Sequence, residues 1–330
     1  MRILFIGGTL RGYRTLRALV EGGWNVAGVL SLRQDDHEVE RYERPIEELA
    51  RDHGIPHVAT KWLKDREYFV SWIGSEVRPD IGIAVGCRVL IPEEIYTLPP
   101  MGTLAVHDSL LPEYRGFAPL NWSILNGEPK TGVTLFYLDE GTDTGDIVAQ
   151  KEVPIAPDAT APEIYERVCD ATIDVLLEAC PLLAAGTASR VQQDPRAGSH
   201  TCSRIPADGE IDWTRSTREI YNQVRALAWP YPGAYTYAEG RKLFVWQAKP
   251  IEDAPRYAGR IPGRVVGVSR ATGAADVLTG DGILRLSEVQ HPGDEKKAAA
   301  EIIRSVKMSL GLRTQDLLAR IEALESRERS

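Results

Sequence analysis

The sequence predicts an α/β protein in which a mostly parallel sheet with helices on both faces is followed by a small antiparallel β-barrel domain. Three observations predict this fold. The chain opens with a buried strand, a glycine-rich turn and an amphipathic helix, and apolar strand segments then alternate with helical ones. Beyond about residue 205 the pattern changes to short β-like runs that glycine, proline and charged residues separate.

The first strand is expected at residues 2–6, and the glycine-rich turn at 7–12 leads into a helix whose apolar residues include Leu16 and Leu19. A second strand at 25–30 completes one βαβ unit of ordinary size. Two helices and then two strands follow, at 45–53, 65–76, 81–85 and 103–106. Alternation of this kind is typical of a doubly wound sheet.

The glycine-rich turn does not predict a dinucleotide site. That fingerprint requires G-x-G-x-x-G and an acidic residue at the end of the second strand. Here the second strand ends in the sequence LSLR at 30–33. We therefore interpret the glycines as residues that permit a tight turn and close packing of a helix on the sheet.

A long amphipathic helix at 161–185 and a polar linker at 192–203 end the first half of the chain. The expected domains are residues 1–205, residues 206–312 and a C-terminal helix and tail at 313–330, in which 313–324 has a helical pattern. The second domain contains the β-like runs 234–237, 242–246, 263–268, 275–278 and 283–289.

Composition excludes several classes of protein. The sequence has no apolar stretch near the roughly 18 residues of a membrane span, so we expect a cytoplasmic protein without a membrane segment. Four scattered cysteines without metal-ligand spacing indicate reduced thiols and no metal site. A net charge of −8 and a pI near 5.4 argue against a broad phosphate-binding surface, so nucleic acid is an unlikely partner.

One segment, 106–150, carries the candidate chemistry. It begins VHDSLLPEYRGFAPLNW and places His107 just past a strand end, where an open α/β sheet forms its ligand crevice. A lone histidine is more often structural, but the whole string resembles the formyltransferase family. The matching positions are His107, 109–112, 114–116, Pro119, Trp122, 126–128, 132–134, Asp143, Gly145 and Ile147.

This resemblance covers about residues 1–312 and implies a fold and an activity. The fold would be a Rossmann-like catalytic domain at 1–205, followed by an OB-like domain at 206–312. The activity would be transfer of a formyl group from 10-formyltetrahydrofolate to a primary amine. By resemblance, three polar side chains act: an asparagine two residues before the histidine, the histidine itself and the aspartate of the D-x-G sequence.

The chemistry explains two of these residues. An amine attacks the formyl carbon and must lose a proton, while the folate nitrogen must leave protonated, so His107 would take and pass protons near neutral pH. Asp143 would orient the imidazole and raise the pKa of His107 above the ordinary value of about 6.5.

The third residue is missing, because the position two before the histidine is Ala105. A methyl group cannot donate a hydrogen bond to an oxyanion, and the loss of one such donor typically costs about 2.7 to 4 kcal/mol. Three explanations stay open: an alanine introduced to trap a complex, a natural enzyme with another oxyanion donor, or a natural member that has lost the reaction and only binds folate or substrate.

The remaining assignments also follow from the resemblance. Folate would lie against the loop of Arg88, Val89 and Leu90 and the loop of Asp139, Glu140, Gly141, Thr142 and Asp143. Ser109, Tyr114, Arg115 and Phe117 would contact the acceptor. We expect a small amine, first a nucleotide-linked amino sugar, then an ornithine-like amino acid or methionyl-tRNA, and a possible homodimer. The acidic early stretch at 33–48 disfavours tRNA.

Overall fold

The computed structural model describes residues 1–33, 46–87, 89–312, 317, 318 and 321. They form two compact units, of which the first comprises Met1–Leu120, Pro129–Ile155 and Glu163–Ser203 and the second comprises Asn121–Glu128, Ala156–Pro162 and the chain from Arg204. Most of the helix expected at 313–324 lies outside the described residues.

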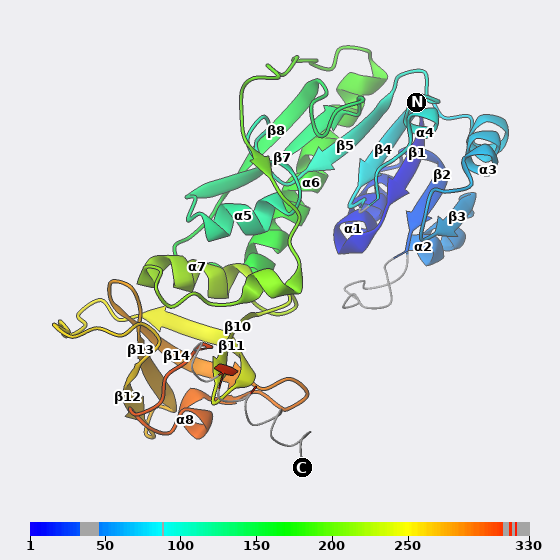
Figure 1. Cartoon of the computed structure of the whole chain (residues 1–330). Coiled ribbons are helices and arrows are strands. Elements are labelled where there is room, and N and C mark those ends of the chain that lie inside the picture. The colour runs from blue at the N-terminus through cyan, green and yellow to red at the C-terminus, as the bar shows by residue number, and fades with distance from the viewer. Residues whose placement is uncertain (34–45, 88, 313–316, 319–320, 322–330) are drawn as a thin grey trace. The chain divides into compact units, whose positions relative to one another are not determined.

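The first unit is built on a seven-stranded sheet with the strand order β3-β2-β1-β4-β5-β7-β8 (Figure 1). Strands β1 to β5 pair with one another in parallel, whereas β7 is antiparallel to both β5 and β8, which confirms the predicted mostly parallel α/β sheet. The strands are β1 (Arg2–Gly7), β2 (Asn25–Leu32), β3 (His57–Thr60), β4 (Ile81–Val85), β5 (Thr103–His107), β7 (Lys130–Tyr137) and β8 (Ile147–Pro154).

Helices cover both faces of this sheet because its strands are apolar on both sides. In β1, Ile3 and Phe5 belong to one core cluster and Leu4 and Ile6 to the other, and all four side chains are fully buried. Burial of one such side chain contributes roughly 1.5 to 3 kcal/mol. The first face carries α1 (Thr9–Glu21), α2 (Ile46–Asp52) and α6 (Ala161–Ala184), and the second carries α3 (Arg66–Trp72), η1 (Ile73–Val77) and α4 (Glu93–Tyr96).

The glycines after β1 allow the close packing that the sequence suggested. A Cβ atom on Gly12 would lie 3.0 Å from the carbonyl oxygen of Val85, at the end of β4. Helix α1 can therefore begin directly against the ends of β1 and β4. These strand ends form the same edge of the sheet as His107, at the end of β5.

The second unit contains a six-stranded antiparallel sheet with the order β10-β11-β14-β13-β12, and β15 pairs with β14. Residues Ser309 and Leu310 bridge to Arg264, next to β12, and to Ala238 in β10, so they link the two edges of the sheet into a barrel. Its elements are η2 (Pro206–Gly209), α7 (Thr217–Ala226), β10 (Ala234–Ala238), β11 (Arg241–Pro250), β12 (Val265–Ser269), β13 (Ala274–Leu278), β14 (Ile283–Gln290), β15 (Lys297–Ala298) and α8 (Ala299–Ile302), and most of α5 (Pro119–Leu125) also belongs to this unit.

Within the described residues, no helix has both the length and the apolar character needed to cross a bilayer. The same residues contain no group of three or more histidine, cysteine or acidic side chains arranged to hold a metal ion. Cys87, Cys169, Cys180 and Cys202 are all free thiols. Burial raises the pKa of Cys87 and Cys180 to about 12, which makes these two thiols poor nucleophiles.

Candidate active site

His107 ends β5 with its side chain about nine-tenths buried and its ring held at one nitrogen. The Nε2 atom lies 2.7 Å from the carbonyl oxygen of Tyr114. A carbonyl oxygen can only accept, so Nε2 carries a proton and donates it to Tyr114. In the neutral imidazole, Nδ1 is then the nitrogen with a free lone pair.

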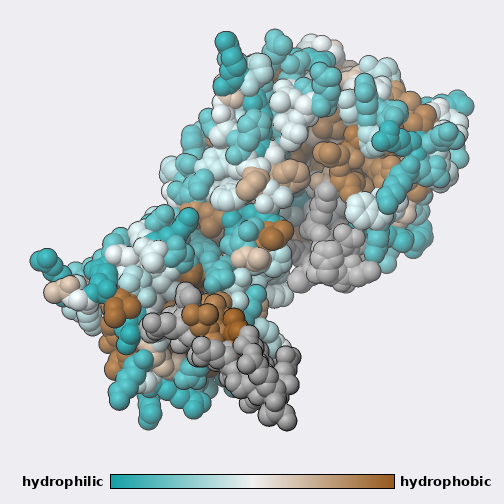
Figure 2. Space-filling model, in the orientation of Figure 1, coloured by the Kyte–Doolittle hydropathy of each residue, from teal (hydrophilic) through white to brown (hydrophobic). Residues whose placement is uncertain are grey.

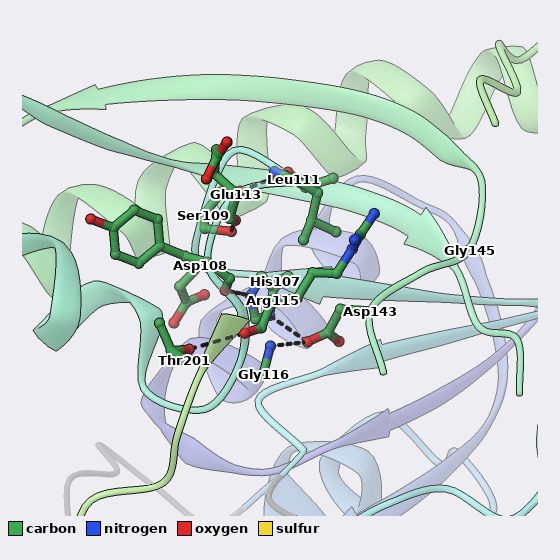
Figure 3. Close-up of polar contacts among 12 residues, drawn as sticks. His107, Asp108, Ser109, Leu111, Glu113, Arg115, Gly116, Asp143, Gly145 and Thr201 are labelled. Carbon is green, nitrogen blue, oxygen red and sulfur yellow. Dashed lines mark hydrogen bonds and ion pairs between the residues drawn. The ribbon is translucent and has the colours of Figure 1, made fainter. Parts of the chain in front are cut away.

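Asp143 lies beside that free nitrogen although 36 positions separate the two residues in the chain. Its Oδ2 atom is 3.5 Å from Nδ1 of His107 and accepts a hydrogen bond of 2.8 Å from the backbone N–H of Gly116 (Figure 3). The carboxylate therefore faces the nitrogen that can gain a proton, where it would stabilise the imidazolium form.

The expected rise in the pKa of His107 is wrong. Burial of the ring lowers the pKa below the ordinary 6.5, and this effect outweighs Asp143 and the Tyr114 carbonyl, which both raise it. Arg11, which forms an ion pair with Asp108 next to the histidine, lowers it further. The imidazole is consequently neutral at pH 7, which is the form that can accept a proton.

The loop that holds His107 is covered by residues 191–201, which we call the strap. The short strand β6 (Arg115–Gly116) pairs in parallel with β9 (His200–Thr201) of the strap (Figure 3). A Cβ atom on Gly116 would lie 2.5 Å from the carbonyl oxygen of Thr201, and Gly116 has a φ of +101°. Only glycine fits this position without displacing the strap. The segment read as a linker is thus part of the site.

The four residues expected to bind the acceptor differ in what their side chains contact and in how exposed they are. The Ser109 hydroxyl donates to the carbonyl oxygen of Glu113 at 2.6 Å, and the Arg115 side chain is fully buried against the strap. Tyr114 contributes its carbonyl group to His107, and Phe117 is 55% exposed. Their roles toward an acceptor stay predictions.

The expected folate loops are mostly open to solvent. Val89 packs at the edge of the core cluster beneath α3, Leu90 is 85% exposed, and Arg88 lies outside the described residues. In the second loop the Asp139 carboxylate accepts from Gly141 and Thr144, which shapes the turn before Asp143, while Glu140 and Thr142 are exposed. Figure 2 shows hydrophobic surface gathered around a hollow on the first unit, amid largely hydrophilic surface.

Ala105 shares a face of β5 with His107, because side chains two apart on a strand point the same way. It is partly exposed and touches the core cluster on the α3 side of the sheet. The polar group that the resemblance leads one to expect at this position is absent.

Sequence reasoning missed Gln193, which lies in the strap and is 7% exposed. Its side-chain amide donates to the carbonyl oxygens of Asp143 and Gly145. The only sequence signal was a glutamine pair in a stretch read as a polar linker, and neither glutamine had an apolar periodicity to indicate burial.

Comparisons with known proteins agree with this fold. A family model described as formyl transferase matches residues 1–180, and one described as formyl transferase, C-terminal domain, matches residues 205–307. Methionyl-tRNA formyltransferase of Symbiobacterium thermophilum is 34% identical over 317 residues, which are 95% of each chain. The enzyme of that name from Clostridioides difficile is 33% identical over 94% of this chain and 99% of its own.

Solved structures share the fold. The N-formyltransferase of Helicobacter canadensis, bound to folinic acid and dTDP-3-aminofucose, has a TM-score of 0.67 at 19% identity over 87% of this chain and 98% of its own. HypX of Aquifex aeolicus, bound to tetrahydrofolic acid, has a TM-score of 0.63 at 22% identity over 93% of this chain, which spans 47% of HypX. The family models and the full-length relatives show that this chain belongs to the formyltransferase family and is a formyltransferase whose formyl donor is 10-formyltetrahydrofolate.

Proposed function

We propose that the acceptor is the α-amino group of methionyl-tRNA. The observation that carries this proposal is the identity of about one third with methionyl-tRNA formyltransferases over 94–95% of this chain, through both domains. This reverses the order of acceptors expected from the sequence, in which an amino sugar stood first. Sequence identity at this level over nearly the whole chain is stronger evidence about the acceptor than the acidic net charge, which argues against tRNA.

The distribution of charge supports an RNA partner better than the net charge does. Residues 1–203 contain 19 basic and 30 acidic residues, a net charge of −11, whereas residues 204–312 contain 16 basic and 13 acidic residues, a net charge of +3. Phosphate contacts come from lysine and arginine, and a local excess of them is sufficient. The second domain is therefore the part suited to a polyanion.

Aromatic rings beside lysines occur on one face of the second domain. Phe244 and Trp246 stack with their ring centroids 5.5 Å apart, and both are only partly buried. The ammonium group of Lys242 lies 5.0 Å from the Phe244 centroid, and that of Lys296 lies 5.0 Å from the Trp246 centroid. Rings that stack on bases next to cations that contact phosphates are a common means of binding unpaired RNA.

For the reaction we assign His107 as the base and Asp143 as the group that stabilises its charged form. As the amine attacks the formyl carbon, its proton passes to Nδ1 of His107, and the imidazolium is stabilised by the carboxylate 3.5 Å away. Because Nε2 is bound to the Tyr114 carbonyl, the same Nδ1 atom must return the proton to the departing folate nitrogen. Amine and folate nitrogens must both reach one side of the ring.

A nucleotide-linked amino sugar is the second candidate. The net charge of −11 on the first 203 residues favours it, because a small acceptor needs fewer phosphate contacts near the catalytic residues than a tRNA does. The cytoplasmic location and the possible homodimer stay predictions under either acceptor.

A competition between acceptors tests the proposal. Formyl transfer from 10-formyltetrahydrofolate is measured with methionyl-tRNA, with dTDP-linked amino sugars and with ornithine, each at several salt concentrations. We expect the highest kcat/KM with methionyl-tRNA, a steep fall with salt, and a further several-fold fall in the Lys242→Ala/Lys296→Ala variant. Turnover of an amino sugar with none of methionyl-tRNA would refute the assignment.

A further inference from the structure

The strap reaches the active site through one buried side chain, Gln193. Its Nε2 atom donates to the carbonyl oxygen of Asp143 at 3.0 Å and to that of Gly145 at 2.7 Å. Its Oε1 atom accepts from Nε of Arg115 at 3.2 Å and from Nη2 of Arg115 at 2.7 Å. A side-chain amide has two donor hydrogens and two acceptor lone pairs, so these contacts use all of them.

Arg115 fixes Gln193 from the other side. The guanidinium is 1% exposed and also donates to the carbonyl oxygen of Ala197 at 3.0 Å and to that of Asp194 at 3.4 Å, both in the strap. Such a fork of donors holds a partner in one orientation. The glutamine amide therefore cannot rotate without losing hydrogen bonds to a buried cation, which is costly.

The turn that Gln193 holds needs support. Asp143 has a φ of +55°, a left-handed conformation that most residues with a side chain avoid and that its surroundings must maintain. Gly145 closes the turn so tightly that a Cβ atom there would lie 1.8 Å from the carbonyl oxygen of Tyr137. Gln193 bonds to both residues, and thus to the two ends of the three-residue segment that presents the carboxylate.

We propose that Gln193 is a positioning residue for formyl transfer: held by Arg115, it keeps the Asp143 turn in the conformation that places the carboxylate beside Nδ1 of His107. The inference rests on the proposed roles of His107 and Asp143. It assigns a function in the reaction to a residue outside the expected folate and acceptor loops, and it explains why an arginine is buried among the neutral oxygens of the strap.

Gln193→Glu separates the two halves of this contact. The glutamate still accepts from Arg115, but it presents an oxygen in place of the amide nitrogen to the carbonyls of Asp143 and Gly145 and so repels the turn. Gln192→Glu is the matched control, because it adds the same charge one residue earlier at an exposed position. Thermal unfolding monitors the fold, and Gln193→Asn, which withdraws the amide by one methylene, serves as a second variant.

The decisive measurement is the pKa of His107, obtained by NMR of the labelled imidazole. The pKa is compared with and without Asp143→Asn in each background, and the difference is the change that Asp143→Asn produces. Loss of a carboxylate this close should lower the pKa by about one unit or more. We expect that change to fall to half or less in the Gln193→Glu and Gln193→Asn backgrounds and to stay at full size in the Gln192→Glu background. Arg11 and its ion-pair partner Asp108, which also lie near the ring, are the same in every protein compared.

The turnover number kcat provides a second test of whether Gln193 acts through Asp143. Gln193→Glu should lower kcat about tenfold or more, and adding it to Asp143→Asn should cause no further loss. An equal change in the pKa of His107 in all backgrounds, or losses that multiply in the double variant, would overturn the proposal. The NMR comparison needs no acceptor, so a wrong acceptor would leave this result standing and would appear only as absent turnover.

Discussion

Replacing Ala105 by asparagine tests whether the chain lacks an oxyanion donor. Residues 105 and 107 point to the same face of β5 and are separated by about 6.6 Å along the strand. An asparagine at 105 would therefore lie on the same side of the sheet as the imidazole, and by resemblance to the family its amide would donate to the formyl oxygen as that atom gains charge. Ala105 is partly exposed, so the larger side chain has room.

The expected gain follows from the strength of one such contact. A donor aimed at a developing oxyanion contributes about 2.7 to 4 kcal/mol, so kcat should rise roughly a hundredfold to a thousandfold in Ala105→Asn. The neighbours of Ala105 on the sheet face are apolar, and a partly unpaired amide there should lower the free energy of unfolding by about 1 to 3 kcal/mol. Faster turnover in a slightly less stable protein is the expected pattern.

Steady-state formyl transfer with saturating 10-formyltetrahydrofolate provides the assay, and Ala105→Leu is the control, because the leucine side chain has the same number and branching of heavy atoms as asparagine but no donor. We expect no gain in the leucine variant. If Ala105→Asn is no faster than the parent while His107→Ala abolishes the parent's activity, another group already stabilises the oxyanion and the reasoning from residue 105 is refuted.

Three further predictions concern the same site. Asp143→Asn should lower the pKa of His107 still further, so the rising limb of the pH–rate profile moves to lower pH. We expect kcat to fall on the order of a hundredfold, because the carboxylate no longer orients the imidazole or stabilises its charged form; an unmoved profile with most activity retained would contradict this. Gly116→Ala should lower the free energy of unfolding by about 1 to 3 kcal/mol in a thermal melt, because of its φ of +101° and its contact with the strap, whereas Gly74→Ala, with no atom within 4 Å of the added Cβ, should be neutral or stabilising. Titration calorimetry with 5-formyltetrahydrofolate should show saturable binding with either alanine or asparagine at position 105, and no binding at millimolar ligand would remove the proposed folate loops.

Much of the first unit could be predicted because its signals are local. The strands expected at 2–6, 25–30, 81–85 and 103–106 are present because a parallel strand buried on both faces has to be an unbroken apolar run. His107 and Asp143 could be paired only through the resemblance, since strand pairing and a loop across the sheet bring them together over 36 positions.

Of the features that were not predicted, one has a local sequence signal and the others do not. The helix α7 has a signal that was overlooked, a capping box in which Ser216 and Glu219 bond to each other's backbone N–H groups. The strap has no such signal, because its contacts are made by backbone groups and by one glutamine whose burial depends on Arg115, 78 positions earlier. The lowered pKa of His107 also depends on tertiary burial, which a sequence pattern does not give.

The strap also decides where this chain can be divided or recombined. All seven strands of the first sheet are complete at Pro154, and α6 ends at Ala184, so a fragment or a domain exchange that stops there would keep the whole sheet core. It would nevertheless lose Gln193 and the pairing of β9 with β6. A chimaera that exchanges the second unit therefore needs its junction after Ser203, and a protease that cuts at the exposed Arg196 should abolish formyl transfer while the first unit remains folded.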